Sequence, residues 1–220
     1  GFGPAGMFAA LTLARHGYRP LVLERGRTID QRQLDVQKFW DQGVLDETSN
    51  VQFGEGGAGT FSDGKLTTRV HDRLMTEVLD ILVEAGAPPE IRYWYKPHIG
   101  TDRLRQVVRN IRRQIEALGG EVQFCRQVTD FRIEAGALTG LVINESSVIP
   151  CSVALLGIGH SARDTYQALH RCGAGMEAKP FSIGVRIEHP QELIDRSQYG
   201  KAAGHPKLGA ADYSLVYHDK

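Results

Sequence analysis

The feature that most constrains this chain is the glycine pattern at its start, Gly1-x-Gly3-x-x-Gly6. Apolar residues at helical spacing follow it, and Gly17 is positioned to end the predicted helix. Next comes a short apolar run, 21–23, which is typical of a strand buried on both faces of a parallel sheet. A glycine loop that opens a helix and precedes such a strand predicts an α/β unit whose loop faces a dinucleotide.

Each glycine of this pattern has a separate physical role. The first allows a tight turn, the second lets the backbone approach a pyrophosphate, and the third lets the helix pack closely on its strand. The amino terminus of the helix offers unpaired N–H groups and a positive dipole end to the phosphates. Glu24 follows the buried strand directly, where its carboxylate would accept hydrogen bonds from ribose hydroxyls and repel a 2′-phosphate.

A second glycine loop, 54–60, favours FAD over NAD. A domain that binds only a nicotinamide dinucleotide repeats βα units after the fingerprint, whereas this chain inserts the second loop and then a predicted meander. FAD is a long cofactor, and a second backbone contact would steady its ribityl and isoalloxazine end. The alternative for these residues is a flexible surface loop.

The remaining hydrophobic periodicity gives the outline of the fold. It predicts a weak helix at 30–40 and two amphipathic helices at 72–85 and 102–118. A three-stranded antiparallel meander is predicted at 122–124, 131–133 and 141–143. A buried parallel strand at 153–156 follows, then a helix to about 172 and a further strand at 181–187. Thr101 or Asp102 is predicted to cap the helix 102–118. The predicted class is α/β, a three-layer Rossmann-type domain with an antiparallel crossover meander.

Bulk composition narrows the partners. Lys plus Arg and Asp plus Glu both number 26, so no net charge attracts the chain to nucleic acid or to an anionic membrane. The chain contains no apolar run long enough for a membrane span. Cys125, Cys151 and Cys172 stand singly, which suits a reducing cytosol and signals neither a redox pair nor a zinc site. We therefore expect a soluble, cytoplasmic protein without a bound metal.

Several segments resemble a known class of flavoproteins. The segments 1–6, 21–26 and 157–161 resemble FAD-dependent oxidoreductases with the glutathione-reductase-type fold. The longer segments 54–66 and 179–189, together with the residues around Gly159, resemble bacterial proteins described as NAD(FAD)-utilising, or FAD-dependent, dehydrogenases, whose substrate is generally unassigned. The resemblance extends over essentially the whole chain.

The resemblance also implies how the chain is organised. Residues 1–176 would form the FAD-binding Rossmann-type domain, and residues 177–220 the beginning of an inserted substrate domain. Compared with such proteins, this chain lacks the first strand of the Rossmann unit and the C-terminal flavin-binding stretch, which predicts that it is a piece of a longer protein.

The resemblance further implies a set of FAD contacts. The first glycine loop would hold the pyrophosphate, Glu24 the ribose, and the backbone of Val128 the adenine. Gly159 and His160 would lie near the pyrophosphate or the ribityl chain, and residues 60–65 would approach the flavin ring. The residues predicted to bind the cofactor are Gly1, Gly3, Pro4, Ala5, Gly6, Glu24, Arg25, Gly56, Gly57, Ala58, Gly59, Thr60, Lys65, Val128, Gly157, Gly159 and His160.

Candidates for acid–base chemistry are few. His98, His160 and His189 are the histidines to test, with a structural role as the alternative for each. Lys65 either places positive charge near a reduced flavin or is simply solvated. Ser161 fits a helix-capping pattern as well as a cofactor loop. The sequence identifies no catalytic residue.

The predicted function is that of an FAD-dependent oxidoreductase that acts on a small molecule, with NAD(P)H as a candidate electron donor. Nucleic acid is not an expected partner. Two alternatives stay open. One is a tRNA-modifying flavoprotein that contacts RNA through a basic helix face, which is formed by Arg103, Arg105, Arg109, Arg112 and Arg113. The other is a protein that binds FAD without catalysis.

Overall fold

The computed structural model describes residues 1–61, 64–66, 68, 72–94, 96–181, 183–185 and 187–217. The chain divides into two compact units, residues 1–176 and residues 177–220. None of the helices in the described ranges is both long enough and apolar enough to cross a membrane.

The first unit begins with the predicted glycine loop, helix and strand. Helix α1 (Pro4–Arg15) starts with proline at its first position, because the fixed φ of proline suits the first turn and its missing N–H costs nothing there. Gly17, with φ of +82°, follows the helix end in the left-handed region that glycine tolerates. Strand β1 (Leu21–Leu23) then pairs in parallel with β2 (Glu121–Gln123).

The pairing of β2 corrects one prediction. The sequence placed residues 122–124 in the antiparallel meander, but β2 is the parallel neighbour of β1. The long helix α4 (Thr101–Ala117) precedes β2 and returns the chain, so that the two strands run in the same direction. Alternating apolar residues reveal a strand but not its partner, which is why the sequence pattern misassigned it.

The antiparallel meander is formed by the three strands that follow. They are β3 (Val128–Glu134), β4 (Ala137–Ile143) and β5 (Ser147–Pro150), in the order β3-β4-β5. Two of the predicted meander strands, 131–133 and 141–143, are thereby confirmed. Ile143 is fully buried, and Phe131 is buried on the same sheet.

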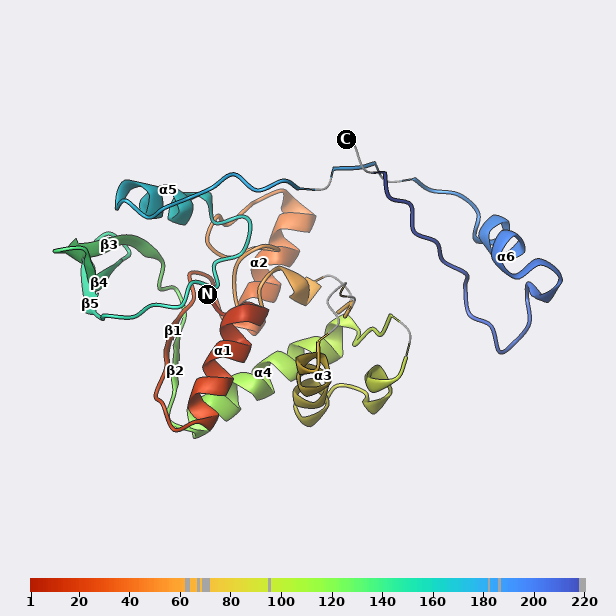
Figure 1. Ribbon diagram of the computed structural model, residues 1–220, viewed down its shortest axis with the longest axis horizontal. Coiled ribbons are helices and arrows are strands. Elements are labelled where there is room, and N and C mark those ends of the chain that lie inside the picture. The colour runs from red at the N-terminus through yellow and green to blue at the C-terminus, as the bar shows by residue number, and fades with distance from the viewer. Residues whose placement is uncertain are drawn as a thin grey trace. The chain divides into compact units, whose positions relative to one another are not determined.

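Helices α1 and α4 pack beside the β1–β2 pair. The others in this unit are α2 (Ile29–Gln42), α3 (Leu74–Glu84) and α5 (Arg163–Arg171), with short 3-10 turns η1 (Ala58–Phe61) and η2 (Pro89–Arg92). Helix α4 buries an apolar stripe that includes Ile111 and Ile115, as its period predicted. Figure 1 shows α1 and α4 beside the β1–β2 pair, while the meander forms a separate sheet.

Two predicted helix caps are wrong. Helix α4 begins at Thr101 itself, with Gly100 at the N-cap position and no side-chain cap. Helix α5 has Ala162 at its N-cap, and the Ser161 hydroxyl donates instead to Gln52 Oε1 at 3.2 Å. In both cases the residue with a capping side chain, Thr101 or Ser161, is the neighbour of the residue at the N-cap position.

Two predicted strands are also absent from the described residues. Residues 153–156 belong to no strand, and Leu155 is 67% exposed. Of 181–187, the described residues again lie outside any strand, although the apolar side chains from Phe181 to Ile187 are exposed. An apolar run predicts a buried strand, but it becomes one only when a neighbouring strand offers hydrogen bonds.

The described residues of the second unit form the helix α6 (Gln191–Tyr199), which is followed by the 3-10 turn η3 (Gly200–Ala202). Asp195 on this helix accepts hydrogen bonds from the backbone N–H of Ala211 at 2.8 Å and from the side chain of Gln191 at 2.9 Å. The bond to Ala211 ties a residue that follows the helical segment back to α6.

Candidate functional site

The two glycine loops meet backbone to backbone. The N–H of Gly56 donates to the carbonyl oxygen of Phe2 at 2.9 Å. A Cβ on Gly57 would lie 2.8 Å from the Cα of Gly3, so the second loop has no room for a side chain at this contact. Gly56 and Gly57 have φ of +86° and +67°, in the left-handed region that favours glycine. The second loop is therefore packed against the first one.

The glycines of the first loop and those of segment 157–159 divide into two kinds. A Cβ on Gly6 would overlap the carbonyl oxygen of Gly1. A Cβ on Gly1 would lie 2.6 Å from the carbonyl oxygen of Gly157. These three glycines are needed for the chain to pack on itself. A Cβ on Gly3 meets one protein atom, at an ordinary 3.6 Å, and a Cβ on Gly159 meets none within 4 Å. At Gly3 and Gly159 the missing side chains leave open space next to the backbone, which a ligand such as a pyrophosphate could occupy.

Glu24 joins the loops through its carboxylate. The side chain is 5% exposed, and its Oε2 accepts a hydrogen bond from Phe2 N at 2.7 Å. Its Oε1 accepts from Gly26 N at 2.9 Å and from Gly54 N at 3.0 Å. A carboxylate has about four acceptor positions, so one remains after these three bonds. Glu24 thus positions both loops, and its predicted contact with ribose would use the remaining position.

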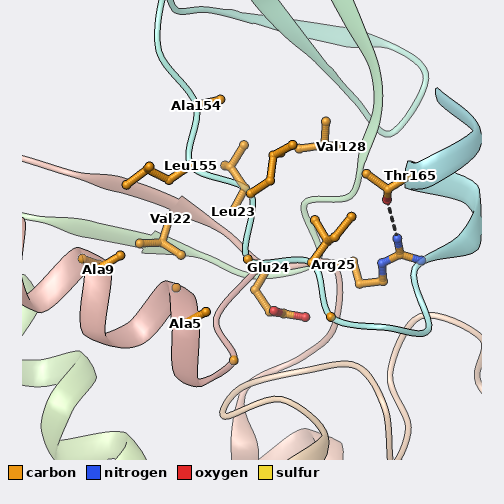
Figure 2. Close-up of a pocket in the computed structure, with 18 of the residues that line it drawn as sticks. Ala5, Ala9, Val22, Leu23, Glu24, Arg25, Val128, Ala154, Leu155 and Thr165 are labelled. Atoms are coloured by element: carbon orange, nitrogen blue, oxygen red, sulfur yellow. Dashed lines mark hydrogen bonds between the residues drawn. The ribbon is translucent and has the colours of Figure 1, made fainter. Parts of the chain in front are cut away.

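Arg25 ties the end of β1 to helix α5. Its Nη2 donates to Asp164 Oδ1 at 2.9 Å and to Thr165 Oγ1 at 3.0 Å, and Figure 2 shows the second of these bonds. Its guanidinium also lies over the ring of Phe53, 4.3 Å from the centroid. Burial alone would raise the pKa of Asp164, but hydrogen bonds from Arg25 and Gln127 and the charge of Arg25 lower it below its ordinary value.

A cavity of about 910 Å³ opens beside these loops, near the upper end of the range of about 300–1,000 Å³ for ligand pockets. All but three of the predicted cofactor residues line it: Gly1, Gly3, Pro4, Ala5, Gly6, Glu24, Arg25, Gly57, Ala58, Gly59, Val128, Gly157, Gly159 and His160. The structure does not bring Gly56, Thr60 or Lys65 to its wall. Gly56 and Thr60 are buried members of the second glycine loop, and Lys65 is exposed.

The two ends of the cavity differ in chemistry. The polar end is formed by the glycine loops, Glu24 and Arg25, while the apolar end lies between β1 and residues 153–156. Figure 2 shows side chains from both of these segments in the pocket wall, among them Leu23 and Leu155. Among the described residues, β1 pairs with β2 alone, so its other edge has no neighbouring strand.

Of the three candidate histidines, only His160 lines the cavity, and its side chain is exposed. His98 is exposed and its backbone bridges to Lys65. His189 belongs to the second unit, where its Nε2 lies 2.6 Å from the hydroxyl of Tyr213. Over the described part of the chain, no group of three or more His, Cys, Asp and Glu side chains is arranged to hold a metal ion.

The predicted basic face of α4 is engaged within the unit. Three of its five arginines make polar contacts with neighbouring side chains: Arg105 with Gln33, Arg109 with Asp30, and Arg112 with Glu55. Two of these partners are carboxylates, so they neutralise part of the charge that an RNA contact would require.

Sequence reasoning missed Arg32 on α2, which belongs to the framework of the site. Its side chain is fully buried below the second glycine loop. Burial lowers its pKa to about 10, although the charges of Glu24 and Glu55 act in the opposite direction. A signal was present in the sequence, because Ile29, Arg32 and Val36 share the buried face of α2 and therefore place a charge in an apolar stripe.

Two comparisons with known proteins bear on this chain, and one of them concerns FAD. Residues 180–220 match the family described as "FAD-dependent protein, C-terminal domain-like". The whole chain is 57% identical over 220 residues to an "Uncharacterized protein" of Clostridium beijerinckii (strain ATCC 51743 / NCIMB 8052), of which it covers 41%. That relative therefore extends well beyond the region matched here. The match suggests a flavin-related protein, and a mixed α/β unit with parallel and antiparallel sheets is compatible with FAD binding.

Proposed function

We propose that this chain forms the dinucleotide end of an FAD site in an oxidoreductase that acts on a small molecule. The observation that carries the proposal is the contact between two glycine loops at the amino terminus of α1, joined by the carboxylate of Glu24 beside a cavity. The family match of residues 180–220 supports the flavin independently, because it falls in a different part of the chain.

The residues present fit FAD at the polar end of the cavity. The first-turn N–H groups of α1 would bind the pyrophosphate, and the open space at Gly3 and Gly159 would admit it. Glu24 would use its remaining acceptor position for a ribose hydroxyl, with Val128 on the adenine side. When bound, FAD supplies hydride or electron transfer, and NAD(P)H is the candidate donor. The protein's own task is to bind and orient the cofactor.

Two alternatives are distinguished by the state of α4 and by flavin reduction. The pairing of Arg109 and Arg112 with carboxylates favours a small-molecule substrate over tRNA. An RNA-binding flavoprotein would lose RNA affinity when the exposed Arg103 and Arg113 are replaced by glutamate. A non-catalytic FAD-binding protein would keep its flavin oxidised with every donor.

The experiment uses the full-length parent protein. We would purify it, record the flavin absorbance, identify the extracted cofactor, and then compare anaerobic reduction by NADH and NADPH. We expect bound FAD that one of the two nucleotides reduces. A protein that purifies colourless and takes up no added FAD would overturn the proposal. Bound FAD that neither nucleotide nor any candidate substrate reduces would instead support the non-catalytic alternative.

A further inference from the structure

Arg32 is the largest fully buried side chain of the described residues. Arginine is rarely buried completely, because removing its charge from water is costly unless hydrogen bonds replace the lost hydration. Its position below the second glycine loop therefore requires a compensating set of contacts.

Those contacts all go to one short segment of backbone. Nε of Arg32 donates to the carbonyl oxygen of Asn50 at 2.8 Å, Nη2 to that of Val51 at 3.0 Å, and Nη1 to that of Glu55 at 2.7 Å. The rigid fork of a guanidinium can hold three carbonyls in fixed relative positions, whereas the single ammonium of lysine cannot reproduce that geometry. The guanidinium also lies 4.9 Å from the ring centroid of Phe61, at the other end of the loop.

Glu55 fixes the same segment from its own side chain. It is fully buried, with Oε2 accepting from Ile29 N at 2.7 Å and Oε1 accepting from Arg112 Nε at 2.7 Å. The first contact joins the segment to the start of α2, and the second joins it to α4. The backbone of residues 50–55 is thus held between two helices.

The held segment leads directly into the cavity wall. Gly54 provides one of the three N–H donors to Glu24, and a Cβ on Gly54 would overlap the side chain of Arg32. Two residues later, Gly56 makes the backbone contact with the first glycine loop, and Gly57 lines the cavity. A shift of the segment would therefore move both the Glu24 donor and the cavity wall.

We propose that Arg32 is a positioning residue for the dinucleotide site, which sets the second glycine loop against the first through three backbone carbonyls. The inference rests on the proposed FAD site but concerns a residue that touches no cofactor. A residue with a purely structural role would affect stability alone. For Arg32 we expect instead that a variant without the guanidinium contacts binds FAD weakly even when the protein still folds.

The test compares two variants of the full-length protein, Arg32→Lys and a control, Ile143→Val. Ile143 is fully buried in the meander and does not line the cavity, so its truncation lowers stability without touching either loop. FAD affinity is measured by titrating the apoprotein and following flavin fluorescence. We expect Arg32→Lys to weaken FAD binding by about tenfold or more, since the fork contacts are lost, while the control stays within about twofold.

A second variant and a second readout keep the test decisive if Arg32→Lys fails to fold. Glu55→Gln keeps an acceptor for Ile29 but removes the charge that faces Arg112. Amide hydrogen exchange at Gly54, Gly56 and Gly57 in the FAD-free protein should accelerate in either variant and not in the control. Wild-type FAD affinity together with unchanged exchange at these amides would overturn the inference. If the wild-type protein itself binds no FAD, the proposed function fails. The exchange measurement would still show whether Arg32 positions the second glycine loop.

Discussion

The polar and apolar ends of the cavity differ in how completely the chain satisfies its own groups. At the polar end, Glu24 has three backbone donors and the two glycine loops share a hydrogen bond. At the apolar end, Leu21 and Leu155 are 41% and 67% exposed, and one edge of β1 faces the cavity without a strand in the described residues. The polar groups at the polar end are satisfied within the chain, whereas the apolar end leaves apolar side chains exposed.

The two ends of the cavity therefore differ in what they could bind. The polar end has the donors and open glycines that suit a diphosphate. The apolar end, between β1 and residues 153–156, is lined by apolar side chains, and an extended strand with apolar side chains would suit it. The following predictions test the two ends separately.

The largest effect is expected at the polar end, from Gly6→Ala. The new Cβ would overlap the carbonyl oxygen of Gly1, and backbone cannot move aside as a flexible side chain can. We expect a loss of about 3 kcal/mol or more in the free energy of unfolding, together with loss of retained flavin in the parent protein. Thermal melting and the flavin content of the purified protein measure the two effects.

Gly59→Ala is the matched control for this substitution. Gly59 lies in the second loop, and a Cβ there meets no other atom within 4 Å. It should leave the melting temperature unchanged. A stable Gly6→Ala variant would show that the first loop is not packed as described.

The apolar end is tested with Leu155→Asp, made both in this chain and in the longer, full-length protein. With Leu155 67% exposed, the change should cost within about 0.5 kcal/mol in this chain. If a strand covers the residue in the longer version, the cost should rise to about 2–3 kcal/mol. Urea denaturation of both versions gives the comparison, and equal losses would argue against a strand in this end of the cavity.

The contrast also explains what the sequence could predict. The first glycine loop, β1 and the stripe of α4 were predictable because each follows from local spacing. The position of Glu24 at the loop was predictable for the same reason. Its three donors were not, because Gly54 reaches it from a loop thirty residues away and only the tertiary fold brings them together.

Failures of prediction have the same origin. The partner of β2 and the absence of a strand at 153–156 depend on which edges meet in space, and apolar spacing carries no information about that. Arg32 was missed because a charged residue in a helix is usually exposed, and only its three backbone acceptors explain its burial.

A smaller effect is expected from Glu24→Gln. The amide keeps the size of the side chain but presents an NH₂ group to one of three N–H donors that now face carboxylate oxygens. We expect a loss of about 1–3 kcal/mol in the free energy of unfolding of the FAD-free protein, because a buried donor is left unsatisfied. A residue that only binds ribose would show no such loss without FAD, so chemical denaturation of the apoprotein distinguishes the two roles.

The smallest effect concerns the contact between Arg25 and Asp164, where the Asp164 side chain is 45% exposed. Because the pKa of Asp164 is lowered in the folded state, its contribution to stability is present above the ordinary value of 3.8 and is lost as the pH falls through the lowered folded value. Solvent screening limits the contribution to about 0.5 kcal/mol. Asp164→Asn should therefore be less stable than wild type by about this amount at neutral pH and equal to it in acid.

Asp102→Asn is the control, since that side chain is 99% exposed. A difference between Asp164→Asn and wild type that persists unchanged into acid would mean that the contact with α5 depends on shape and hydrogen bonding rather than on charge.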